Sequence, residues 1–203
     1  VAGTLSLIFA FIMVFFPGPF MGLFSNNEEL VELAAQYARI VGPSYVFNSL
    51  NQVYLGAQRS MENPRVGLGV LAVSMCSNTL LNYMLIFGKF GAPALGVVGA
   101  AAATLISRII EFIVTFSYAG LNRRFRLKWN LLLRPGRTLI SRFVHYASPV
   151  VFNETMWGLG TSLFPTIMGH MAGSTEILAA FTLAGNLEKI STVAIFAVAN
   201  AAA

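Results

Sequence analysis

Long apolar runs dominate the chain, and short stretches rich in Gly, Pro, Asn or charged residues separate them. Strands of a membrane barrel would alternate apolar and polar residues over about ten positions, and these runs do not. In lipid, each segment must satisfy its own backbone polar groups, so the pattern predicts an all-α fold, a polytopic transmembrane helix bundle. Six runs reach the roughly twenty residues that cross a bilayer: 1–24, 30–58, 66–88, 95–120, 147–169 and 177–203.

Proline and glycine positions refine this pattern. Residues 17–19 (PGP) should loosen the end of the first span, and Pro43 predicts a kink in the second. Gly99 and Ala103 lie four apart in the fourth span, a spacing that lets helix backbones approach closely in lipid. Both ends of the chain fall inside apolar runs, so we expect a piece of a longer protein.

Composition supports a membrane environment. The chain is 56% hydrophobic and 10% charged, against roughly 25% charged in soluble domains, and its mean hydropathy is +0.70. The net charge of +5 is concentrated in one loop between apolar spans, which indicates membrane topology and argues against nucleic-acid binding. The single Cys76 excludes an internal disulfide and a cysteine-based metal site within the chain.

Lys and Arg are distributed unevenly between the loops. Residues 121–146 hold seven and residues 59–65 hold two, whereas the three other loops together hold Lys89. Cytoplasmic loops carry the excess of basic residues, so these two loops are predicted to be cytoplasmic. The basic stretch also divides the chain into three parts: four spans in 1–120, a cytoplasmic basic interfacial connector in 121–146, and two spans in 147–203.

Charged residues inside apolar spans usually mark a transport pathway or pair with one another. Arg108 and Glu111 lie three apart on one helix, a spacing that predicts a structural ion pair. Glu188 and Lys189 are adjacent and point about 100° apart on a helix, so each needs a partner elsewhere.

Glu154 differs from these residues because its helical neighbours supply no counter-ion. The residues three and four positions away are Val150, Val151, Trp157 and Gly158. One interpretation is a carboxyl kept protonated by burial, acting as a hydrogen-bond donor between helices. The other is a site that exchanges a proton, a metal cation such as Na⁺, or a cationic substrate. Nearby polar residues and Pro149 hydrate and loosen this part of the helix, which favours the second interpretation.

Three stretches resemble the multidrug and toxic compound extrusion (MATE) family: residues 56–65 (GAQRSMENPR), 81–88 (LNYMLIFG) and 91–108 (GAPALGVVGAAAATLISR). The first is similar to the family's cytoplasmic loop after its fourth helix, although residues 60–63 depart from the small residues with Asp and Thr that are more usual there. The third is similar to the run that leads into the family's sixth helix. The order and spacing correspond to about helices three to eight of twelve.

The resemblance implies a two-lobed transporter. Residues 1–120 would be the last four helices of the amino-terminal lobe and residues 147–203 the first two of the carboxy-terminal lobe. It further implies antiport of cationic or amphipathic organic compounds against H⁺ or Na⁺ in a bacterial inner membrane, by alternating access. Glu154 matches the coupling carboxylate of the seventh helix, while Asn186 and Glu188 are weaker candidates for cation coupling or substrate binding. The expected partners are the lipid bilayer, small organic substrates and the remaining helices, with no cofactor beyond the coupling ion.

Two alternatives remain open. A flippase for lipid-linked or polysaccharide substrates would use the same fold but a more cationic cavity, for which Arg39, Arg108 and Lys189 are the available residues. An intramembrane enzyme would need paired catalytic groups. His145 and His170 stand apart in the sequence and no glycine-rich phosphate loop is present, so an enzyme is not expected.

Overall fold

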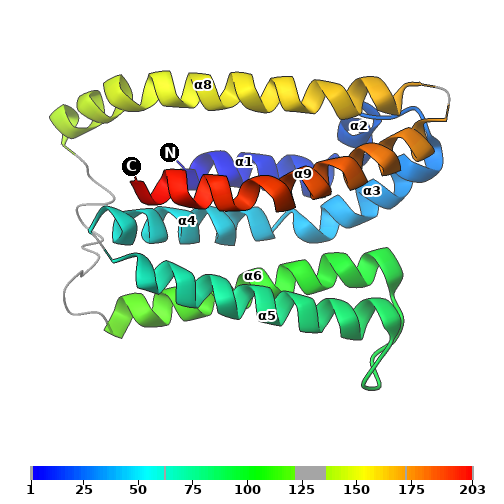
Figure 1. Cartoon of the computed structure of the whole chain (residues 1–203), viewed down its shortest axis with the longest axis horizontal. Helices are drawn as coiled ribbons and strands as arrows, with labels where there is room; N and C mark the ends of the chain where they lie inside the picture. The colour runs from blue at the N-terminus through cyan, green and yellow to red at the C-terminus, as the bar shows by residue number, and fades with distance from the viewer. Residues whose placement is uncertain (1, 62, 122–135, 172, 203) are drawn as a thin grey trace. The chain divides into compact units, whose positions relative to one another are not determined.

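The computed structural model describes residues 2–61, 63–121, 136–171 and 173–202, where it contains helices and turns but no strand. The all-α prediction is therefore confirmed. By length and composition, two of these helices could cross a membrane, α5 and α6. The helices are α1 (Ala2–Phe15), α2 (Pro17–Gly22), α3 (Glu28–Val41), α4 (Ser44–Ser60), α5 (Pro64–Phe87), α6 (Gly96–Leu121), α8 (Arg137–Gly169) and α9 (Ser174–Ala202) (Figure 1).

Proline breaks the first two spans where the sequence predicted. Pro17 begins α2 one residue beyond the end of α1, and the second span divides into α3 and α4 at Gly42 and Pro43. Proline lacks an N–H and cannot continue the hydrogen-bond ladder. The Gly42 N–H still bonds to the Ala38 carbonyl at 2.7 Å. A β-carbon on Gly42 would lie 3.0 Å from a methyl group of Val14, so glycine lets α1 approach the break closely.

The fifth span is longer than predicted. The sequence placed its start at residue 147, whereas α8 is one continuous helix from Arg137, with Pro149 and Pro165 inside it. Extending an existing helix costs little compared with nucleating one, so the residues before 147 join it. At 33 residues, α8 is about 50 Å long and exceeds the hydrocarbon thickness. Residues 122–135, which include most of the predicted connector, lie outside the described residues.

The chain separates into two compact units. Unit 1 comprises Val1–Met21 and Glu29–Phe143, and unit 2 comprises Gly22–Glu28 and Val144–Ala203. In unit 1, α5 and α6 lie side by side (Figure 1). A β-carbon on Gly99 would overlap the Leu85 carbonyl, so the two helices touch through the backbone. A stripe of residues four apart on α6 is buried: Gly99, Ala103, Ser107, Glu111 and Thr115.

In unit 2, the loop before α3 meets the end of α8. The Ser25 hydroxyl donates to the Gly169 carbonyl at 3.2 Å, and a β-carbon on Gly169 would overlap the Phe24 carbonyl oxygen. Gly169 and Ser174 are buried, whereas most other described side chains of α8 and α9 are exposed. This unit is therefore held together mainly at one end of its helices.

Candidate functional site

Glu154 lies near the middle of α8, five residues after Pro149. The proline removes the N–H that would otherwise bond to the His145 carbonyl, which leaves the backbone there less satisfied. The Glu154 side chain is exposed, and within the described ranges its carboxylate makes no hydrogen bond or ion pair. Thr155, its neighbour, donates to the Val151 carbonyl at 2.6 Å. Glu154 is thus the single acidic residue of α8, and the described residues give it no counter-ion.

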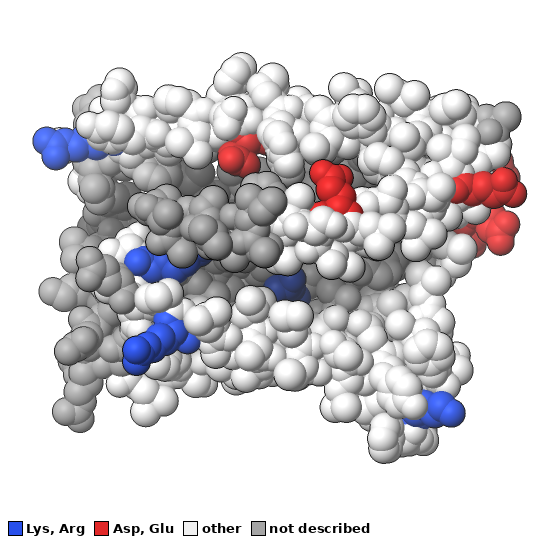
Figure 2. Space-filling model, viewed as in Figure 1, with Lys and Arg blue, Asp and Glu red and all other residues white. Residues whose placement is uncertain are grey.

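Asn186 and Glu188, the weaker predicted candidates, lie on α9 and are also exposed. The Glu188 backbone carbonyl accepts a hydrogen bond from Thr192 at 2.8 Å, but its carboxylate makes no contact of this kind with the described residues. No hydrogen bond or ion pair in the described part of unit 2 joins Glu154, Asn186 and Glu188. On the face shown in Figure 2, charged side chains are few and scattered among uncharged ones.

A row of hydrogen-bonded polar side chains joins α5 and α6, and the sequence predicted only the contact between Arg108 and Glu111. Arg108 Nη1 lies 2.6 Å from Glu111 Oε2, so the predicted contact is confirmed. The Ser74 hydroxyl donates to the same oxygen at 2.8 Å. One helical turn away, Asn78 Nδ2 donates to the Ser107 hydroxyl at 3.1 Å. We call Ser74, Asn78 and Asn82 on α5, with Ser107, Arg108 and Glu111 on α6, the polar seam.

The sequence did contain a signal for this seam. Ser74, Asn78 and Asn82 are spaced four apart in an apolar span, and such residues lie on one helix face. Asn82 Nδ2 donates to Asn78 Oδ1 at 2.9 Å. Polar side chains often bond across helices in lipid, so this face predicted a polar neighbour. The spacing along α5 could not predict that the residue facing Ser74 was Glu111.

A second buried polar face runs along α4. Asn51 is 0% exposed, and neither polar atom of its amide has a hydrogen-bond partner among the described residues. It lies between two aromatic contacts to α6: Phe47 with Phe112 at 5.3 Å between ring centroids, and Tyr54 with Phe116 at 6.5 Å. Buried amides without protein partners commonly bind ordered water, which is the partner expected for Asn51.

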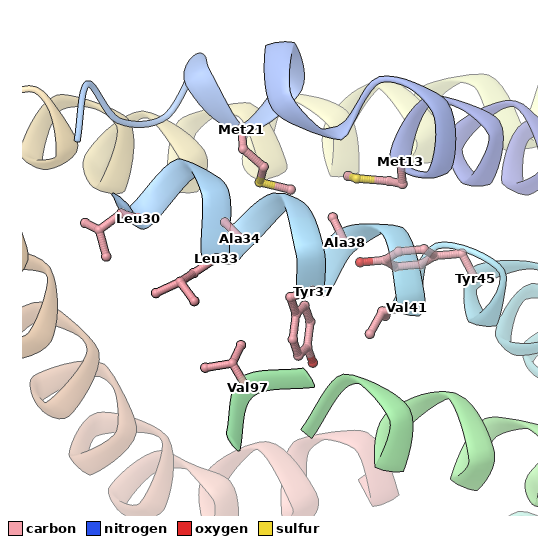
Figure 3. A pocket seen from close by; sticks show the side chains of 10 residues that line it. All are labelled: Met13, Met21, Leu30, Leu33, Ala34, Tyr37, Ala38, Val41, Tyr45 and Val97. Carbon is pink, nitrogen blue, oxygen red and sulfur yellow. The ribbon is translucent and has the colours of Figure 1, made fainter. Parts of the chain in front are cut away.

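Unit 1 also contains an apolar pocket of about 460 Å³. This volume falls in the range of pockets that bind small molecules. Tyr37 and Tyr45 supply its polar groups, and Tyr45 packs edge-on against Phe9 with 5.0 Å between ring centroids. The pocket has no Lys, Arg, Asp or Glu in its lining, which consists of Met13, Met21, Leu30, Leu33, Ala34, Tyr37, Ala38, Val41, Tyr45 and Val97 (Figure 3).

Comparison with known proteins identifies a matching family model and several relatives of this chain. The family model MatE matches residues 1–84. A probable multidrug resistance protein NorM of Thermotoga maritima is 25% identical over 89% of this chain and 39% of its own length. A NorM of Haemophilus ducreyi, described in the same words, is 36% identical over 54% of this chain and 25% of its own length. Over most of its length the chain is similar to members of the MATE family.

A further MATE relative, the probable multidrug resistance protein YoeA of Bacillus subtilis, is 33% identical over 56% of this chain and 25% of its own length. The chain spans about two-fifths of the Thermotoga relative. No solved structure matches the chain. MATE proteins are integral membrane transporters, and this chain is similar to them over part of their length. Among the residues that the structure describes, no cluster of His, Cys, Asp or Glu could hold a metal ion.

Proposed function

We propose that the protein containing this chain is a secondary antiporter of the bacterial inner membrane. It exports cationic or amphipathic organic compounds in exchange for H⁺ or Na⁺ by alternating access. Its matched relatives come from bacteria and are described as probable multidrug resistance proteins, and the apolar pocket of unit 1 suits the hydrophobic part of such a compound.

One observation carries the coupling proposal, the free carboxylate of Glu154. At 1.5 Å per residue it lies about 22 Å from the Gly169 end of α8, which is less than the roughly 30 Å thickness of the hydrocarbon core. A charged group at that depth is costly and needs a counter-charge. The described residues provide none, so a proton, Na⁺ or a basic substrate group fills that role. Release of one then favours capture of another, which couples the two fluxes.

The test uses full-length protein that contains this chain, reconstituted in vesicles with an imposed proton or sodium gradient. Glu154→Gln keeps the size and hydrogen-bonding capacity of the side chain but removes its charge. We expect normal expression and loss of gradient-driven dye transport. Glu176→Gln, at the exposed start of α9, is the matched control and should transport normally. Undiminished transport by Glu154→Gln would reject the coupling role.

Asn186 and Glu188 take a secondary place in this proposal. Both lie on α9 in the same unit as Glu154, and an amide or carboxylate oxygen can serve as a ligand for a hard cation such as Na⁺. Asn186→Ala and Glu188→Gln should therefore weaken sodium dependence without abolishing transport. An unchanged dependence of transport on sodium concentration in both variants would remove them from the coupling site.

A further inference from the structure

Residues 22–28 lie between α2 and α3 in the sequence, but they group with α8 and α9 in unit 2. We call them the outer loop. They contact the turn between α8 and α9, at residues 169–171 and 173–175, and one hydrogen bond of this contact joins residues 144 positions apart. Neither segment contains Lys or Arg, so the sequence predicts that both lie on the outer side of the membrane.

Ser25 is at the centre of this contact and is 9% exposed. Its hydroxyl donates to the Gly169 carbonyl at 3.2 Å and accepts from the Asn27 N–H at 3.2 Å. The Asn27 side chain in turn donates to the Thr175 hydroxyl at 3.5 Å. Each such bond adds little net stability, because water replaces it when the contact opens. The contact is therefore specific in its geometry but can break and re-form at low cost.

Gly169 allows the two segments to meet. A β-carbon at this position would overlap the Phe24 carbonyl oxygen. Gly158 and Gly160, on the same helix, have nothing within 4 Å of an added β-carbon. Gly169 belongs to α8 and has no positive φ, so the conformation of the helix does not itself require glycine there. The requirement comes from the outer loop, and it exists only while the contact is formed.

We propose that the outer loop and the α8–α9 turn form a latch, whose contact closes the transport pathway on the outer side and breaks when the pathway opens outward. The inference rests on the proposed alternating-access function and names the residues that close one side. Alternating access exposes the site to each side in turn, so a contact that closes the outer side must form and break in each cycle. Segments that move in this way are among the least stable parts of a protein, and the few weak bonds of this contact fit that behaviour.

The test measures opening of this contact in full-length protein in intact cells. Ser174 lies in the α8–α9 turn and is 9% exposed, so a cysteine there reports opening by its reaction with a membrane-impermeant maleimide added outside. Native cysteines, including Cys76, are replaced by serine. Gly169→Ala should raise the labelling rate about tenfold, because overpacking opposes closure. Gly160→Ala, the matched control on α8, should leave the rate within about twofold.

Ser25→Ala removes a hydrogen bond without adding bulk, so it provides a second measurement should Gly169→Ala fail to fold. It should raise the labelling rate of Ser174→Cys about threefold, as expected for the loss of a neutral hydrogen bond. Equal labelling rates in Gly169→Ala and Gly160→Ala would overturn the proposal. A rate that Ser25→Ala leaves unchanged, or no labelling from outside in any variant, would also overturn it.

Cross-linking tests the consequence for transport. Asn27→Cys and Thr175→Cys replace two side chains that lie in contact, and oxidation by copper phenanthroline should join them and hold the latch closed. We expect gradient-driven dye transport to stop and to recover after reduction with dithiothreitol, whereas Asn27→Cys alone should transport normally after the same oxidation. Failure to cross-link, or continued transport by the cross-linked protein, would overturn the latch. Labelling that Gly169→Ala accelerates in a protein without gradient-driven transport would instead count against the efflux function alone.

Discussion

Glu111 on α6 and Glu154 on α8 have the same side chain in two opposite settings. Glu111 is buried and accepts hydrogen bonds from Arg108 and Ser74, whereas Glu154 is exposed and makes no such contact with the described residues. A carboxylate whose charge is already satisfied gains little from exchanging its partners. One without a fixed partner can exchange protons or cations at small structural cost. The contacts of Glu111 fit a packing role, and the exchange role proposed for Glu154 needs a carboxylate of the second kind.

The strongest test of this difference is the same substitution, Glu to Gln, at both positions. Glu111→Gln removes the charge from a buried ion pair and leaves Arg108 without its counter-charge. We expect a loss of about 2 kcal/mol in the free energy of unfolding, moderated because Arg108 is partly exposed. Glu154→Gln should leave stability unchanged. Thermal unfolding of full-length protein in detergent measures the stability of both variants. Equal losses of stability would contradict the difference between Glu111 and Glu154.

Two glycines extend the comparison to the backbone. Gly99 on α6 touches the Leu85 carbonyl, whereas Gly158 on α8 has nothing within 4 Å of an added β-carbon. Gly99→Ala should therefore force α5 and α6 apart and cost about 1–2 kcal/mol, as overpacking does. Gly158→Ala should be neutral or slightly stabilising, because alanine restricts the unfolded chain. The melting temperatures of the two variants test this, and a stable Gly99→Ala protein would contradict the close approach.

Local patterns account for what could be predicted from the sequence. Pro43 predicted a kink at the point where α3 ends and α4 begins, and the spacing of Arg108 and Glu111 predicted their contact, because both features depend on residues within one turn. The continuity of α8 before residue 147 was missed, because the basic residues there indicated a loop. Ser74 was missed because a sequence does not show which residues face each other across two helices. Glu154 stays a prediction, and it could be made from the sequence because the absence of a basic neighbour is a local feature.

The smallest expected effect concerns single hydroxyls in the two regions. Ser74 donates to Glu111 across the α5–α6 interface at 2.8 Å, whereas Ser162 on α8 donates to the Gly158 carbonyl of its own helix at 2.8 Å. Ser74→Ala leaves a buried carboxylate with one donor fewer and should cost about 1 kcal/mol. Ser162→Ala should change stability by a few tenths of a kcal/mol at most, because a hydroxyl bonded back to its own helix adds little. Parallel thermal unfolding of the two alanine variants measures the difference. If Ser162→Ala proved the more costly, α8 rather than the polar seam would contain the tightly held interface.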